Sequence, residues 1–369
     1  MKYETLRQAV KNYPKYNGCV KVERSPLIHR GFPGTFNLSF NEKHWLDEFG
    51  RYTEFSHDYI FSTVQSCIRP DDILKLDTPD AWKYLGVFEL ADLTGMMAFT
   101  DRPDHNKLQR WQVRNLIDFL ENLGISPDRV HASYCSGGKV ADLTKGKYSF
   151  DFDVPEDEIS RNAFIENGVP ESNLIPDNSR DTFLSLHLHR PTPWGYRNEI
   201  SVNIGTEEES KLVDIATIEY SQWAPLYKNS ETTSKNIVDL RGCNNGFSIV
   251  ATGLERLCMV ANGLPRIQDV DYIIPFYEAL GEERVLGGES LRALHRIYSD
   301  ITHYGCRTSR HHKKKMRYML QKVDLILTGE QVRELLKIHS ETQPWHPELQ
   351  EGIEPTIERI KLYNTSKKK

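Results

Sequence analysis

Long apolar runs are absent from this chain of 369 residues. No stretch approaches the roughly 20 consecutive apolar residues that a helix needs to span a bilayer. The first residues, Met1 to Thr5, lack the apolar core of a secretory signal peptide. The sequence therefore predicts a cytoplasmic protein that does not enter a membrane. Its 38% hydrophobic and 27% charged residues are ordinary for a globular protein, and its length suffices for one large or two medium domains.

Cysteine is also scarce, and its spacing is irregular. The six cysteines are Cys19, Cys67, Cys135, Cys243, Cys258 and Cys306. Because none of them form a Cys-x-x-Cys pair, we expect reduced thiols rather than a zinc site or a disulfide framework. Internal repeats and a P-loop pattern are missing as well. The net charge is −5, so nucleic acid, if it binds, must meet a local cluster of basic side chains.

The most informative stretch runs from Gly246 to Pro265. Residues 247–251 are apolar and β-prone, and residues 252–262 have the apolar spacing of one helical face. Thr252 and Glu255 have the T-x-x-E spacing of a capping box, and Gly263 supplies a stop signal. Arg256 is thus predicted in the first turn of a helix that leaves a strand. A guanidinium there can bind phosphate oxygens in a bidentate manner or lie flat on a purine; the alternative is an ordinary junction with a surface arginine.

A hairpin is predicted upstream. Residues 63–69 alternate as in a half-buried strand, Pro70 ends it, residues 71–81 form a polar loop, and residues 83–93 return as a second strand. Arg69 lies at the turn of this hairpin. Taken alone, the hairpin would be explained by a surface ion pair between Arg69 and Asp71 or Asp72.

Two further strands are predicted to face a ligand. Residues 199–204 alternate strictly, and the polar face of Glu199, Ser201 and Asn203 suits a cleft. Residues 212–220 form the next strand, in which Asp214 and Thr217 would point to opposite faces if the strand were regular. Helices are predicted at 4–12 and 107–123, and from 156 toward a turn at 168–170, with a strand at 130–134.

Beyond Pro275 the pattern is helical, and one helix start is strongly basic. The candidate nucleic-acid-binding residues in this run are Arg307, Arg310, Lys313, Lys314 and Arg317. Such a cluster can follow a phosphate backbone, and the alternative is a solvated charged face.

These motifs, in this order, resemble the catalytic core of alanyl-tRNA synthetases, which are class II aminoacyl-tRNA synthetases. Gly253-Leu-Glu-Arg256 after an apolar strand is similar to the third class II motif, and the run to Pro275-Phe276 is similar to the alanyl version. Gln65-Ser-Cys-Ile-Arg69 resembles the family's Gln-x-Cys-[Ile/Val]-Arg, and Phe88-Glu-Leu90 resembles its Phe-Glu-Met. The resemblance extends from residue 5 to about residue 325, without the family's editing and C-terminal oligomerising domains.

The resemblance implies an α+β fold: an antiparallel sheet flanked by helices in residues 1–280, then a helical domain with a basic patch in residues 281–369. It implies ATP-dependent activation of a small amino acid as an aminoacyl-adenylate, with Mg²⁺, and transfer to tRNA or another acceptor. Two alternatives stay open. One is a paralogue that activates a substrate other than alanine for a small molecule or carrier protein. The other is a catalytically silent paralogue that binds tRNA or regulates another enzyme.

The resemblance also implies roles for single residues. Arg69 and Arg256 would be catalytic and would contact ATP, together with Glu89, Glu199 and Gly253. Glu199 and Asp214 would hold Mg²⁺, Asp214 standing where the family has Glu.

The amino-acid pocket departs from the family. The family's ammonium-binding Asp aligns with Ile249, its pocket Asn aligns with Thr217, and one of two cysteines before Glu199 is replaced by Arg197. An ammonium against Ile249 would lack a counter-charge, at a cost of several kcal/mol. Glu219 shares a strand face with Thr217, so we predict that Glu219 anchors the amine of the substrate. Ala251 would line the same pocket. The alternative is an exposed Glu219 on an edge strand.

Overall fold

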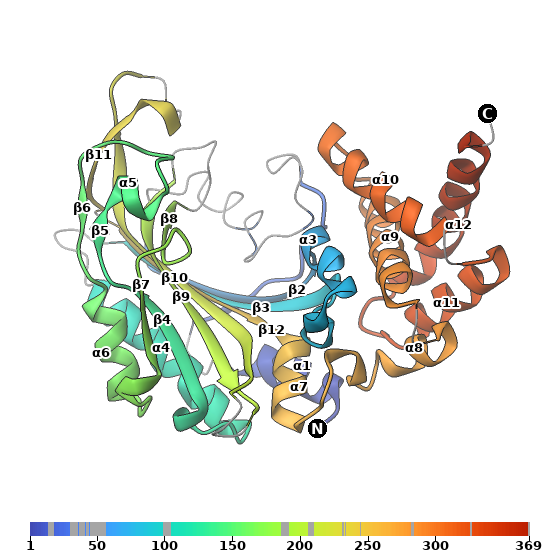
Figure 1. Cartoon of the computed structure of the whole chain (residues 1–369), viewed down its shortest axis with the longest axis horizontal. Helices are drawn as coiled ribbons and strands as arrows, with labels where there is room; N and C mark the ends of the chain where they lie inside the picture. The colour runs from blue at the N-terminus through green and yellow to red at the C-terminus, as the bar shows by residue number, and fades with distance from the viewer. Residues whose placement is uncertain are drawn as a thin grey trace.

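The computed structural model describes residues 1–13, 18–29, 36, 41, 44, 57–98, 105–185, 192–205, 210–230, 232, 234–243, 245–281, 284–324 and 327–367. A large twisted sheet forms one part of the molecule and a group of helices from the C-terminal third forms the other (Figure 1). The fold is therefore α+β, as predicted.

The main sheet has ten strands in the order β1-β2-β3-β12-β10-β9-β4-β7, with β11 on β10 and β8 on β9. Its strands are β1 (Val20–Lys21), β2 (Tyr59–Ile68), β3 (Val87–Ala98), β4 (Val130–Cys135), β7 (Leu174–Asp177), β8 (Phe183–Ser185), β9 (Trp194–Asn203), β10 (Leu212–Tyr227), β11 (Ile237–Gly242) and β12 (Asn245–Gly253). A separate two-stranded sheet joins β5 (Gly138–Lys139) to β6 (Asp153–Val154).

The expectation of a wholly antiparallel sheet is wrong at both edges. β1 pairs with β2, and β4 with β7, in parallel. A parallel pair needs a crossover connection, and the chain between β4 and β7 supplies one through α5 (Val140–Leu143) and α6 (Glu158–Glu166). The central strands, which bear the predicted site, are antiparallel.

Helices cover one face of the sheet. These are α1 (Tyr3–Asn12), α4 (His105–Asn122) and α7 (Leu254–Asn262). The apolar side of α4 is buried as its spacing predicted, through Leu108, Leu116 and Leu120. β2 is buried along its length after Tyr59, so the prediction of a half-buried strand is wrong. It lies between two strands and has packing on both of its faces.

The predicted polar loop after Pro70 is also wrong. The chain forms α3 (Pro70–Leu74) and the two 3₁₀ turns Lys75–Asp77 and Pro79–Lys83 before β3. Pro70 suits the first position of a helix, because its fixed φ is helical and its missing N–H would have no partner there. Ile73 and Leu76 are then buried against the core.

The predicted strand–helix junction at Arg256 is confirmed, with one correction. β12 ends at Gly253, α7 begins at Leu254, and Gly263 ends α7 in the left-handed conformation with φ 61°. The helix has no side-chain cap, so the predicted capping box is absent. Thr252 is still part of the strand, and the Glu255 carboxylate bonds elsewhere.

The C-terminal part is helical, as predicted. It contains α8 (Ile274–Leu280), α9 (Val285–Tyr304), α10 (Arg310–Asp324), α11 (Gly329–Glu341) and α12 (Glu348–Lys367). α9 is buried on every side from Leu286 to Asp300, so it is the central helix of the group. One hydrophobic cluster continues from the sheet into these helices.

Candidate functional site

A cleft of about 370 Å³ opens on the face of the sheet opposite α1, α4 and α7. It brings together most of the residues that the sequence predicted for ATP, metal and substrate. These are Arg69, Glu199, Asp214, Thr217, Glu219, Ile249, Ala251, Gly253 and Arg256. They come from four segments of the sequence, at residues 69, 199, 214–219 and 249–256, so their meeting in one cleft depends on the order of the strands.

The floor of the cleft is set by strand register. Thr217 of β10 lies opposite Ala251 of β12 and Glu199 of β9. One step along, Glu219 lies opposite Ile249 and Arg197. Directly opposed residues of antiparallel strands point to the same face, so both rows face the cleft.

Asp214 reaches the same face through an irregularity in β10. Asp214 pairs with Ser201 and Ala216 pairs with Ile200, so Ile215 is an extra residue. Such a bulge shifts the alternation by one position. The prediction that Asp214 and Thr217 point to opposite faces is therefore wrong: Asp214 accepts a hydrogen bond from Ser201 Oγ at 2.7 Å and lines the cleft with Thr217.

Arg197 is a cleft residue to which the sequence reasoning gave no function. Its guanidinium pairs closely with Glu199, and its Nε lies 3.7 Å from Oε1 of Glu219. That Nε is buried and has no hydrogen-bond partner among the described residues. The alternation that placed Glu199 on a polar strand face, continued back by two residues, would have included Arg197.

Glu219 is held less tightly than Glu199. Oε2 of Glu199 accepts a hydrogen bond from Thr217 Oγ1 at 3.3 Å, in addition to the pairing with Arg197. The described residues make no hydrogen bond to the carboxylate of Glu219, whose side chain is 18% exposed. Its oxygens can therefore accept bonds from a ligand in the cleft, and Glu219 lies on a central strand rather than on an exposed edge.

Charge is concentrated at this end of the cleft. Burial raises the pKa of Glu199; Arg197 opposes the rise, and the carboxylates of Asp214 and Glu219 add to it. Three carboxylates lie within electrostatic reach of two guanidiniums, those of Arg197 and Arg69, so one negative charge is left over and the local charge favours a cation. Either a substrate ammonium or a divalent metal fits this requirement.

The donor set fits Mg²⁺ bound together with a polyphosphate. Magnesium is commonly held by one or two carboxylates, substrate phosphate oxygens and water. Glu199 and Asp214 provide two carboxylates on one face of the sheet. Within the described residues no group of three or more acidic, His or Cys side chains could hold a metal on its own.

The two arginines predicted to contact ATP have different neighbours. The Arg69 guanidinium lies 5.5 Å from the ring of Phe88. Arg256 donates from Nε to the carbonyl of Lys83 at 3.1 Å and from Nη1 to the carbonyl of Asp214 at 3.3 Å, and it lies 5.4 Å from the ring of Tyr84. Both guanidiniums line the cleft, where they can meet phosphate oxygens or the face of a base.

Glu89 does not line the cleft. Its neighbour Phe88 does, and successive side chains of a strand point to opposite faces. The carboxylate of Glu89 is buried on the other face, where it accepts hydrogen bonds from Arg7 Nε at 2.7 Å and Tyr3 OH at 3.0 Å. The structure therefore offers no support for a contact between Glu89 and adenine.

The residues predicted to bind nucleic acid are all exposed: Arg307, Arg310, Lys313, Lys314 and Arg317. The last four lie at i, i+3, i+4 and i+7 of α10, which places them on one face of the helix. The buried face of α10 carries Met316, Met319 and Val323. Arg307, Lys313 and Arg317 also line an open groove against α12.

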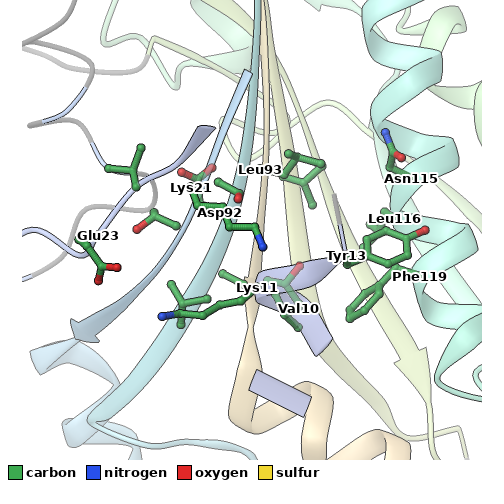
Figure 2. Close-up of a pocket in the computed structure, with 17 residues that line it drawn as sticks. Val10, Lys11, Tyr13, Lys21, Glu23, Asp92, Leu93, Asn115, Leu116 and Phe119 are labelled. Carbon is green, nitrogen blue, oxygen red and sulfur yellow. The ribbon is translucent and has the colours of Figure 1, made fainter. Parts of the chain in front are cut away.

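A second cavity of about 130 Å³ lies under the helices on the other face of the sheet (Figure 2). Val10 and Tyr13 meet Leu116 and Phe119 across it. Its wall includes Val250, which alternates with the cleft residues Ile249 and Ala251, so the two cavities are separated by the sheet. None of the predicted site residues line this cavity.

No protein-family model matches the chain, and no curated protein matches it. All six cysteines are free thiols. Among the described residues, no helix has the length and apolar character needed to cross a membrane.

Proposed function

We propose that this chain is an AMP-forming ligase with a class II synthetase type of site, which activates a small amino acid with ATP and Mg²⁺. The observation that carries the proposal is the meeting of Arg69 and Arg256 with Glu199 and Asp214 in one cleft. The two guanidiniums can bind the phosphates of a nucleoside triphosphate, and the two carboxylates can bind its metal.

In the proposed reaction a carboxylate oxygen of the substrate attacks the α-phosphorus of ATP. The new O–P bond forms as the bond to pyrophosphate breaks, so the products are an acyl-adenylate and pyrophosphate. Arg69 holds the α-phosphate and the reacting carboxylate, and Arg256 holds the nucleotide at the start of α7. The protein contributes positioning and charge neutralisation rather than a covalent intermediate. A bound Mg²⁺ would supply further neutralisation of the phosphates.

Glu219 is proposed to take the amine of the substrate. It lies beside Ile249, where the family's ammonium-binding Asp would stand, and its carboxylate faces the cleft. Because the charged partner has moved by one strand, from β12 to β10, the amine must sit differently from that of alanine in the family. A small amino acid other than alanine is accordingly a candidate substrate.

The acceptor is proposed to be tRNA or another RNA, on the evidence of the exposed basic face of α10. A small molecule or a carrier protein is the alternative acceptor. Salt-sensitive RNA binding favours the first, because phosphate contacts release counterions.

Pyrophosphate exchange into ATP tests the proposal directly. The assay is run with each of the twenty amino acids and with common biosynthetic acids. Exchange that depends on one small amino acid supports the ligase. If no acid supports exchange while tRNA still binds, the chain is the catalytically silent paralogue and the proposal is wrong.

A further inference from the structure

The first residues of β3 lie at an edge that β12 leaves open. β12 pairs with β3 as far as Gly253 opposite Leu90, and the chain then turns into α7. The N–H groups of Val87 and Glu89 point to this side of β3, since they are two residues apart. Without β12 they need other acceptors, because an unpaired buried N–H is costly.

Two buried glutamates complete this edge. The N–H of Glu89 donates to the carboxylate of Glu255 at 2.9 and 3.1 Å. The N–H groups of Gly86 and Val87 donate to Oε2 of Glu289 at 2.7 and 3.2 Å. Glu255 belongs to α7, but Glu289 belongs to α9, the central helix of the C-terminal part. That part therefore supplies an acceptor that the sheet lacks.

The helical C-terminal part also contacts the side chain of Glu89. His346, which precedes α12, lies with Nε2 at 3.0 Å from Oε1 of Glu89. Nδ1 of His346 accepts from Arg296 of α9 at 2.9 Å. This leaves the proton of a neutral imidazole on Nε2, where it is donated to Glu89. His346 is 1% exposed and Glu89 is 3% exposed, so solvent does not compete for this bond.

Phe88 lies between Val87 and Glu89, the two residues that these contacts hold. Its ring lines the cleft and packs 5.5 Å from the guanidinium of Arg69. On either side, Val87 is held by Glu289, and Glu89 is held by His346 together with Arg7, Tyr3 and Glu255. The backbone of Phe88 has little freedom as a result. Because the guanidinium of Arg69 packs against the ring of Phe88, its position is restricted as well.

We infer that Glu289 and His346 of the helical part are positioning residues, which fix Phe88 of β3 and through it Arg69 of the cleft. The kinetic consequence of this inference rests on the proposed function, in which Arg69 binds ATP. The helical part then has a role in the chemistry of the cleft besides any contact with RNA.

The test compares the full-length chain with His346→Phe, which keeps an aromatic ring but removes the polar contacts with Glu89, Arg296 and Ser66, and with His346→Gln, which keeps an amide donor for Glu89. His303→Phe is the matched control, since His303 lies at the exposed end of α9 and pairs with Glu351. The first measurement is amide hydrogen exchange of residues 84–92. The second is the KM for ATP in pyrophosphate exchange.

We expect His346→Phe to speed amide exchange in residues 84–92 about tenfold or more, a local opening without global unfolding. The KM for ATP should rise by a similar factor, about tenfold. His346→Gln should restore most of both values, and His303→Phe should change neither. If His346→Phe does not fold, Glu289→Gln provides the same measurement at Gly86 and Val87.

Wild-type protection of residues 84–92 in folded His346→Phe would overturn the inference, whatever the activity. An unchanged KM for ATP in that variant would also overturn it, since Arg69 would then not depend on His346. Failure of the proposed function looks different: the wild-type chain would show no pyrophosphate exchange, while the protection of residues 84–92 would still depend on His346.

Discussion

Arg197 and Glu219 lie directly opposite each other on β9 and β10, with Nε of the arginine 3.7 Å from Oε1 of the glutamate. This distance is too long for a hydrogen bond. Arg197 is drawn instead toward Glu199, with which it pairs closely. Glu219 therefore lies near a positive charge but makes no hydrogen bond to it. This is the arrangement expected of a carboxylate that exchanges an internal partner for a ligand.

The first prediction concerns Glu219→Gln. If Glu219 binds the substrate ammonium, the variant should raise the KM for the amino acid about tenfold or more, the usual effect of losing a hydrogen bond to a charged group. The KM for ATP should stay the same. Steady-state pyrophosphate exchange measures both constants. Asp181→Asn, an exposed carboxylate at the rim of the same cleft, is the matched control. An unchanged KM for the amino acid in Glu219→Gln would show that another group holds the amine.

The second prediction concerns the arginines of the cleft. Arg69→Ala and Arg256→Ala should each abolish detectable adenylate formation. Arg256→Ala should cost about 2–3 kcal/mol of unfolding free energy, because the variant loses two bonds to backbone carbonyls but no packed core. Pyrophosphate exchange and urea unfolding provide the two measurements. Near-normal exchange by folded Arg256→Ala would contradict the class II assignment of the site.

The third prediction concerns the basic face of α10. Replacement of Arg310, Lys314 and Arg317 by Ala should weaken tRNA binding and flatten its salt dependence, by about 0.7–0.9 in the log–log slope per lost phosphate contact. Filter binding at several salt concentrations measures the slope. Lys337→Ala on α11 is the control, since Lys337 is exposed but lies outside this face. Binding that is insensitive to salt, or too weak to detect, would favour a small molecule or a carrier protein as the acceptor.

The fourth prediction concerns the buried pair His295 and His339. Nε2 of His295 faces the carbonyl of Leu349 at 2.8 Å and must donate to it, so Nδ1 of His295 accepts from Nδ1 of His339 at 2.9 Å. Both rings are therefore neutral. Burial lowers the pKa of His295 to about 3 and lowers that of His339 well below its usual value.

The sign of the pH effect follows from these directions. Below pH 6.5 the unfolded chain binds protons at these positions and the folded chain does not, so stability is complete above about pH 6.5 and is lost as the pH falls toward the folded pKa values. The pair should lower the unfolding free energy by about 3 kcal/mol between pH 7.5 and 5.5, from about 1.4 kcal/mol per histidine. Urea unfolding at several pH values measures this. The loss of unfolding free energy between pH 7.5 and 5.5 should be about 1.4 kcal/mol smaller in His339→Gln than in the wild-type chain, and it should be unchanged in the exposed-site variant His303→Gln. An equal slope in His339→Gln and the wild-type chain would contradict the neutral pair.

Much of the local structure could be read from the chain. The alternation of residues 199–204 predicted β9, the apolar spacing after Gly253 predicted α7, and Gly263 marked its end in the left-handed conformation. These features depend on periodicity and on backbone freedom, which are properties of neighbouring residues. The placement of Arg256 at a strand–helix junction followed from them, independently of any resemblance.

The cleft itself needed strand order and register. Ile215 is one extra residue in β10, and it reverses the face of Asp214 relative to Thr217. Glu89 was expected beside ATP, yet the pleat of β3 turns it to the other face, where Arg7 neutralises its charge and His346 donates a hydrogen bond to it. Glu255 was expected to cap its own helix, but the open edge of β3 offered a buried N–H that competes for its carboxylate. Periodicity along the chain was enough to place most of the strands, helices and charged faces. It could not show which of these faces meet, because a strand's partners, register and bulges set the direction of each side chain.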